Sequence, residues 1–214
     1  MSPQTGMMIL VTLVMGWFAA GSIWNVRKGK AVLRWMQGGL PLLGERTTVR
    51  WLGTTSVEMV IAKARKPFEQ ATVVIFLEPR DVPWIWGPSR ARGRRDTLIV
   101  RVRLARTPTA DLEAIDVGSW SGREARPRIT GERWELREPK GAEPLPLFYK
   151  LDRAPALADE CLALLRKEGL TVRRLSIRRS EPHLQVHIDL PSAATGAAEV
   201  FEVVKGIGER AVRV

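Results

Sequence analysis

The chain has 214 residues, of which 45% are hydrophobic and 27% are charged, and this composition excludes a wholly disordered protein. Its formal net charge of +11 at pH 7 predicts a polyanionic neighbour, such as lipid headgroups, nucleic acid or an acidic protein. Because Cys161 is the one cysteine, the chain can form neither an intrachain disulfide nor a cysteine-based metal site.

The N-terminal segment predicts a membrane anchor. No charged side chain precedes Arg27, and residues 7–24 are almost continuously apolar. A helix needs about 20 apolar residues to cross the hydrocarbon core of a bilayer. Residues 1–26 are therefore predicted to form a single transmembrane helix, with Trp24 at its interfacial end.

A cleaved signal peptide is the alternative, because residues 19–22 are small. A signal peptide carries positive residues before its apolar segment. Here the positive residues follow it, as Arg27, Lys28, Lys30 and Arg34. The positive-inside rule then predicts a cell-membrane protein with its N-terminus outside and its C-terminal region in the cytoplasm. Gly16 and Ala20 have the small-xxx-small spacing that would allow a homodimer.

The positive charge is concentrated next to the predicted anchor. Residues 27–106 contain 17 Lys and Arg against 6 Asp and Glu, whereas residues 107–214 contain 17 of each. An anionic leaflet attracts nearby basic groups by about 1 kcal/mol each. The membrane-proximal part of the chain is therefore predicted to lie against anionic lipid. The alternative is that the excess arginines simply face solvent.

Residues 82–95 combine two tryptophans and an isoleucine with a run of arginines. One interpretation places the tryptophans at headgroup depth while the arginines bind phosphates. The other packs the tryptophans on the core of the domain. Residues 27–46 are interpreted as a basic, amphipathic juxtamembrane segment, in which residues 32–36 and 40–43 are expected to lie flat on the bilayer. The predicted membrane-surface residues are Arg27, Lys28, Lys30, Arg34, Trp35, Trp84, Trp86, Arg90, Arg92, Arg94 and Arg95.

Residues 47–118 are predicted to form a basic, β-rich domain. The expected strands are 47–52, 56–64, 71–77, 97–105 and 110–117, of which the last two are expected to form a hairpin. The run 71–77 is apolar throughout, which suits a strand buried on both faces. Residues 119–144 are rich in Gly, Arg, Glu and Pro and are interpreted as a linker with one strand at 132–137.

The C-terminal region, residues 145–214, has a clearer pattern. Strands are expected at 145–151, 170–179, 183–190 and 211–214, with helices after Asp152 and after Ser192. The order β-α-β-β-α-β predicts a ferredoxin-like α/β sandwich. The whole chain is thus predicted to be an α+β protein with an N-terminal transmembrane helix, a β-rich domain and this ferredoxin-like domain.

No residue pattern indicates catalysis, a cofactor or a metal. His183 and His187 fall on one predicted strand, about 13 Å apart at the usual rise per residue, which is too far to share an ion. Cys161 lies on an apolar helix stripe, as a core thiol does. Nucleic-acid binding is disfavoured because the C-terminal strands lack exposed aromatic side chains. The sequence therefore favours a non-enzymatic, membrane-anchored adaptor or accessory subunit with a protein partner. A tethered nucleic-acid binder and an enzyme with an unrecognised site are the alternatives.

Overall fold

The computed structural model describes the whole chain except residues 1, 132, 140–144, 193 and 214. The described helices are α1 (Pro3–Gln37), α2 (Leu40–Leu43), α3 (Pro83–Ala91), α4 (Trp120–Thr130), α5 (Ala154–Lys167) and α6 (Ala197–Ala211). The described strands are β1 (Gly44–Trp51), β2 (Ser56–Ala64), β3 (Phe68–Phe76), β4 (Thr97–Leu104), β5 (Leu112–Ile115), β6 (Glu135–Arg137), β7 (Leu147–Tyr149), β8 (Val172–Ile177) and β9 (Leu184–Asp189). This mixture of helices and antiparallel sheet confirms the predicted α+β class.

The strands form one sheet in the order β1-β2-β3-β4-β9-β8-β5-β7-β6, and every neighbouring pair is antiparallel. Strand β4 pairs with β9 from Thr97 opposite Asp189 to Val102 opposite Leu184. Strands expected in two separate domains therefore belong to one sheet. The expected hairpin between β4 and β5 is wrong, because β9 and β8 lie between them.

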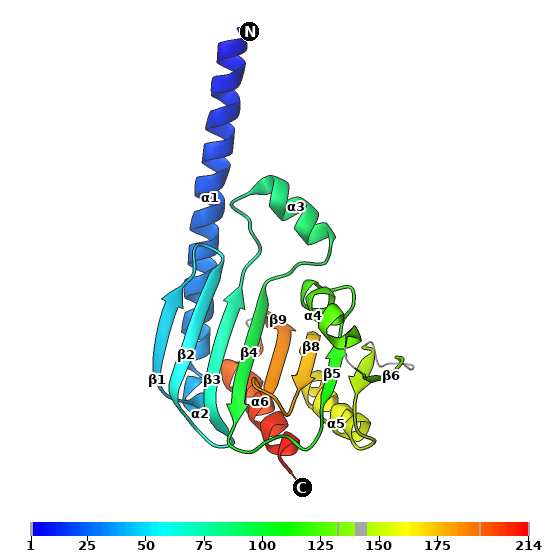
Figure 1. Ribbon diagram of the computed structural model, residues 1–214. Helices are drawn as coiled ribbons and strands as arrows, with labels where there is room; N and C mark the ends of the chain where they lie inside the picture. The colour runs from blue at the N-terminus through cyan, green and yellow to red at the C-terminus, as the bar shows by residue number, and fades with distance from the viewer. Residues whose placement is uncertain (1, 132, 140–144, 193, 214) are drawn as a thin grey trace.

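One face of the sheet is covered by α2, α5, α6 and the C-terminal part of α1 (Figure 1). Alternate strand residues such as Val57, Val73, Val100 and Val186 point to these helices and are fully or almost fully buried. Phe201 on α6 is the largest of the fully buried side chains. Burial of such apolar surface, at about 25 cal/mol per Å², is the main source of stability for this layered core.

The ferredoxin-like arrangement is not confirmed. Both predicted helices and the strands β7, β8 and β9 are present, but β5 lies between β7 and β8. The predicted last strand is absent from the described residues, since α6 continues to Ala211 and Val212 and Arg213 form no strand. The end of that strand, at residue 214, lies outside the described residues. The hydrophobic pattern predicted the order of helices and strands along the chain, but it did not predict which strands pair with each other.

Helix α1 has two parts with different surroundings. Its N-terminal half projects beyond the sheet (Figure 1), and its most apolar stretch, long enough to cross a membrane, is only 6% buried. In its C-terminal half Asn25, Gly29, Val32 and Met36 are buried against the domain. The expectation that residues 32–43 lie flat on a bilayer is therefore wrong, because Val32, Met36 and Leu43 belong to the core.

The second face of the sheet is covered locally by α4. Ala125 and Ile129 pack on Ile115 of β5, with Trp134 and Phe148 beside them. This helix begins where Ser119 caps the N–H of Gly122 at 3.0 Å. The segment interpreted as linker thus contains a packed helix as well as strand β6. Its few apolar residues and internal Pro127 concealed the helical pattern.

Candidate functional site at the junction of α1 and the α3 arm

Residues 77–96 leave the sheet at the end of β3 and return to it at the start of β4, where Phe76 lies opposite Thr97. We call this excursion the α3 arm, since it carries α3. The arm extends beyond the sheet on the side from which α1 projects, and it lies beside α1 (Figure 1). The arm contains the Trp- and Arg-rich stretch that the sequence singled out.

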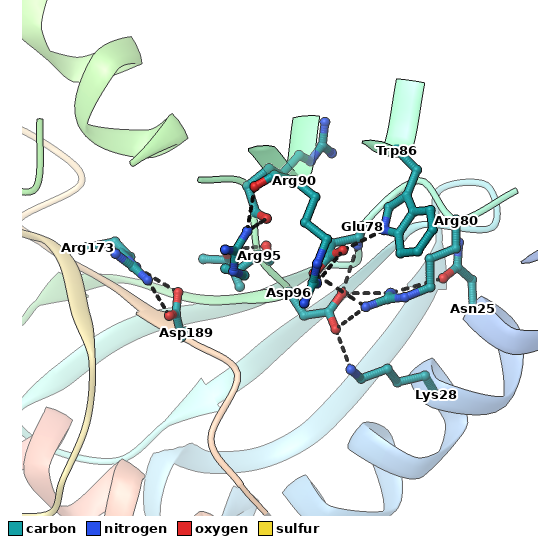
Figure 2. Close-up of polar contacts among 12 residues, drawn as sticks. Asn25, Lys28, Glu78, Arg80, Trp86, Arg90, Arg95, Asp96, Arg173 and Asp189 are labelled. Atoms are coloured by element: carbon teal, nitrogen blue, oxygen red, sulfur yellow. Dashed lines mark hydrogen bonds and ion pairs between the residues drawn. The ribbon is translucent and has the colours of Figure 1, made fainter. Parts of the chain in front are cut away.

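A buried carboxylate at the base of the arm joins it to α1 (Figure 2). Asp96 accepts two hydrogen bonds from Arg80, at 2.9 and 2.8 Å, and one from the ammonium of Lys28 on α1. The backbone N–H of Glu78 donates to the same carboxylate at 2.7 Å. Burial alone would raise the pKa of Asp96, but the hydrogen bonds from Arg80, Lys28 and Glu78 outweigh it and lower the pKa.

A second buried carboxylate, that of Glu78, fixes α3 to the base of the arm. It accepts hydrogen bonds from the indole N–H of Trp86 at 2.6 Å and from Arg90 at 2.7 Å. Its side chain is only 3% exposed, and Arg80 lies 3.5 Å from it. Charge-assisted bonds to a desolvated carboxylate are strong and directional, so α3 has a fixed orientation relative to the sheet.

Helix α1 meets the arm along one stripe of its surface. The indole N–H of Trp17 donates to the carbonyl of Arg80 at 2.9 Å, and the Trp17 and Trp86 rings are 6.3 Å apart. At Gly21 a Cβ atom would lie 2.4 Å from the same carbonyl. One and two turns further, Asn25 accepts from Arg80 at 3.3 Å and Lys28 pairs with Asp96. Glycine at position 21 is what allows this close backbone approach.

The two tryptophans of the arm have different surroundings. Trp84 is 62% exposed and its neighbour Ile85 is 47% exposed, whereas Trp86 is half-buried against Trp17 and Glu78. Trp86 thus packs on the protein, whereas Trp84 is exposed and its contact with lipid headgroups stays a prediction. An apolar groove of about 310 Å³ remains between α1 and α3, lined by Trp17, Ala20, Gly21, Trp24, Arg80 and Trp86.

The predicted membrane-surface residues of α1 also include both exposed side chains and side chains packed against the protein. Arg27, Lys30 and Arg34 are exposed, whereas Lys28 is partly buried in its ion pair with Asp96. The indole N–H of Trp35 donates to the carbonyl of Thr195 at 2.8 Å, and its ring packs against the main core. Trp35, predicted as a membrane-surface residue, therefore stabilises the fold.

The four arginines after α3 also have separate roles. Arg90 pairs with Glu78, and Arg95 donates to the carbonyls of Arg90 and Arg94, which closes the end of α3. The guanidinium of Arg94 lies 5.6 Å from the ring centre of Trp120. Arg92 is exposed. The structure brings these residues to one end of the sheet without merging them into a single patch.

Sequence reasoning missed the residues that hold the junction together, namely Gly21, Glu78, Arg80 and Asp96. A signal was present, because acidic residues are rare in residues 27–106 and three of them, Glu78, Asp81 and Asp96, flank the Trp- and Arg-rich stretch. Isolated acids in a basic region are candidates for buried ion pairs.

No protein-family model matches the chain, and no curated protein matches it. Among the described residues, no group of three or more His, Cys, Asp or Glu could hold a metal ion. His183 accepts a hydrogen bond from the backbone N–H of Leu104 at 3.1 Å and has a structural role. The junction of α1 with the α3 arm is therefore the candidate functional site.

Two further titratable groups lie in the domain away from the junction. Glu113 is fully buried on the second face of the sheet, where Arg174, Arg178 and Ser176 donate to it at 2.7 to 2.9 Å. Burial raises the pKa of the Cys161 thiol to about 12. Cys161 is thus a core thiol, as predicted, and it does not react as a nucleophile at neutral pH.

His187 makes the stability of the domain depend on pH. Burial, together with the positive charges of Arg174 and Arg101, lowers the pKa of His187 to about 3. The unfolded chain has a histidine pKa near 6.5, so it takes up a proton first as the pH falls. The stabilisation is complete above pH 6.5 and is lost between pH 6.5 and 3.

We expect the free energy of unfolding to fall by about 1.4 kcal/mol between neutral pH and pH 5.5 through His187. Urea titrations at both pH values measure this difference. In a His187→Leu variant the difference should shrink by that amount. An unchanged pH dependence in the variant would show that other groups are responsible.

Proposed function

We propose that this chain is a single-pass protein of the cell membrane whose sheet domain is held against the cytoplasmic surface in a fixed orientation. The observation that carries the proposal is the junction itself. Hydrogen bonds and close packing join the α3 arm to α1 at residues 17, 21, 25 and 28. A domain locked to its anchor in this way cannot rotate freely relative to the bilayer.

The exposed part of α1 supports a retained anchor. Met7, Leu10, Leu13 and Trp17 are 46 to 66% exposed, so this surface is left uncovered by the domain. Cleavage of a signal peptide after residues 19–22 would remove Trp17 from the arm and expose the apolar groove. The positive residues Arg27, Lys30 and Arg34 lie on the domain side of the span, which supports a cytoplasmic domain.

The same geometry supports a position of α3 at the membrane surface. At 1.5 Å per residue, Trp17 lies about 10 Å before Trp24 along α1, and Trp86 contacts Trp17. We propose that α3 lies near the interfacial end of the span, within about 10 Å of the level of Trp24, with Trp84 and Ile85 exposed to the interface between headgroups and acyl chains. Nearby arginines would then contact anionic headgroups.

We propose that such an anchored domain acts as a non-enzymatic adaptor or accessory subunit. The part of the chain after residue 106 has as many acidic as basic residues, which suits a protein partner better than a lipid surface. Cross-linking of the full chain in intact membranes, followed by purification, should recover one defined protein partner. Recovery of the chain alone would contradict the adaptor role.

Orientation can be tested with single cysteines, since the natural Cys161 is buried and unreactive. Cysteine at position 4 should react with a membrane-impermeant maleimide in intact cells. Cysteine at position 107, exposed beyond the far end of β4, should react only after the cells are permeabilised. Labelling of position 107 in intact cells would contradict the cytoplasmic location.

The two arm tryptophans should differ in their effect on stability. Trp84→Ala should change the free energy of unfolding by less than about 0.5 kcal/mol, because the ring is exposed. Trp86→Ala should reduce it by about 1–2 kcal/mol, because Glu78 loses a hydrogen bond and Trp17 loses its contact. Chemical unfolding in detergent measures both, and equal effects would contradict this division of roles.

A further inference from the structure

A narrow notch lies between the returning end of the α3 arm and the N-terminus of α4. Its lining includes Arg94, Arg95, Ser121, Trp120 and Arg173, from three separate segments of the chain. The guanidinium of Arg123 on α4 donates to the carbonyl of Arg92 on the arm at 2.8 Å, so the two sides of the notch are tied together. Figure 2 shows Arg95, Arg173 and Asp189 in this region.

The notch contains hydrogen-bond donors for which the described residues provide no acceptor. Ser121 is only 4% exposed, and its hydroxyl has no hydrogen-bond partner among the described residues. The first N–H groups of a helix have no acceptor within the helix. The hydroxyl of Ser119 accepts a hydrogen bond from the N–H of Gly122, and its carbonyl accepts one from the N–H of Arg123. Among the described residues no acceptor is found for the N–H groups of Trp120 and Ser121. A buried hydroxyl left unpaired costs about 1–3 kcal/mol, which a bound acceptor would recover.

The charges around the notch favour an anion. The lining holds three arginines, Arg94, Arg95 and Arg173, against one carboxylate, that of Asp189, which is paired with Arg173. One guanidinium nitrogen of Arg95 donates hydrogen bonds to the carbonyls of Arg90 and Arg94 at the end of α3. The guanidinium of Arg94 makes no hydrogen bond or ion pair among the described residues, and it lies over the ring of Trp120. A free guanidinium beside an unsatisfied helix N-terminus is a common arrangement for binding phosphate.

We propose that this notch binds a phosphate group. Its enclosed volume of about 10 Å³ admits one oxygen atom, which would accept from Ser121 and from the N–H groups at the start of α4. The remaining oxygens would lie outside the notch, where Arg94 can reach them. The ligand is therefore free phosphate or a terminal phosphate on a larger molecule, because the notch is too small to enclose a whole phosphate group.

Two sources of phosphate are consistent with this chemistry. Helices α3 and α4 both lie at the end of the sheet from which α1 projects (Figure 1), so the headgroup of a phosphomonoester lipid is within reach if the proposed membrane location holds. A soluble phosphate compound is the other source. The site itself does not depend on the proposed function; only the choice between these sources does.

The test uses the full chain in detergent and equilibrium dialysis with radiolabelled inorganic phosphate. We expect saturable binding of one phosphate per chain. Arg94→Gln should weaken it about 10- to 100-fold, and Ser121→Ala about tenfold, as expected for losing a charge-assisted and a single hydroxyl hydrogen bond. Arg92→Gln is the matched control, because it removes the same charge from an exposed neighbour and should leave binding unchanged.

The source is assigned by competition in nanodiscs of phosphatidylcholine with and without phosphatidic acid. Displacement of labelled phosphate by phosphatidic acid indicates the lipid headgroup, and no displacement indicates a soluble phosphate compound. Absence of saturable phosphate binding would overturn the proposal. Equal weakening by Arg92→Gln and Arg94→Gln would also overturn it, since general attraction by positive charge would then explain the binding. Neither outcome would bear on the orientation measured with single cysteines.

Discussion

Replacing Asp96 by Asn lowers the free energy of unfolding by about 3–5 kcal/mol, which is the usual effect of removing one partner from a buried ion pair. The change leaves Arg80, whose side chain is 14% exposed, and Lys28 without their common counter-ion. The amide also cannot accept the same set of hydrogen bonds as the carboxylate. Chemical unfolding of the full chain in detergent, followed by circular dichroism, measures the loss.

The control for this substitution is Glu69→Gln, which removes the carboxylate that pairs with Arg103 on the open surface of the sheet. That pair is solvent-exposed and should matter little for stability. Because the pKa of Asp96 lies below its unfolded value of 3.8, its stabilisation is present above pH 3.8 and is lost at lower pH. Equal stability of Asp96→Asn and the wild type at pH 7 would contradict the role assigned to the carboxylate.

Replacing Gly21 by Leu should separate the α3 arm from α1. The Cβ atom would lie 2.4 Å from the carbonyl of Arg80 and 2.5 Å from the Cα of Asp81, and both are backbone atoms that cannot turn aside. We expect a loss of about 3 kcal/mol in the free energy of unfolding, at the upper end for overpacking, because the Trp17 hydrogen bond is broken as well. Leucine is otherwise favourable in an apolar helix.

Gly16→Leu provides a matched control on the same helix, since no atom lies within 4 Å of a Cβ at that position. Spin labels at positions 15 and 85, both exposed, would report the separation of α1 and α3 by pulsed electron resonance. The wild type and Gly16→Leu should give one narrow distance distribution. Gly21→Leu should give a broad one, and a narrow distribution identical to the wild type would mean that the arm does not depend on the close approach.

Much of the secondary structure followed directly from the sequence. The alternation of Leu98, Val100, Val102 and Leu104 predicted β4, and these residues are all buried on one face. The apolar stripe through Cys161 and Leu165 predicted α5 in the same way. The spacing of apolar residues indicates which face of a helix or strand is buried. This spacing is local, so it can be read from one sequence without knowledge of distant contacts.

Strand pairing and the junction could not be predicted on the same basis. The position of β5 between β7 and β8 depends on contacts between residues far apart in sequence, such as Glu113 opposite Phe148 and Ser176. Gly21 is needed because the carbonyl of Arg80, 59 residues later in the chain, lies against α1. The same carbonyl accepts a hydrogen bond from Trp17, one helical turn before Gly21. The sequence therefore identified the tryptophans and arginines of the arm but not the carboxylates that orient them.

The proposed location of α3 at the membrane surface is tested most directly by measuring the depth of α3 in a bilayer. A spin label at position 85 of the full chain, reconstituted into liposomes that contain anionic lipid, can be compared with a label at position 107, beyond the far end of β4. We expect position 85 to be accessible to oxygen and protected from a water-soluble nickel chelate, and position 107 to show the opposite. Equal exposure of both positions to the chelate would mean that α3 does not lie at the membrane surface.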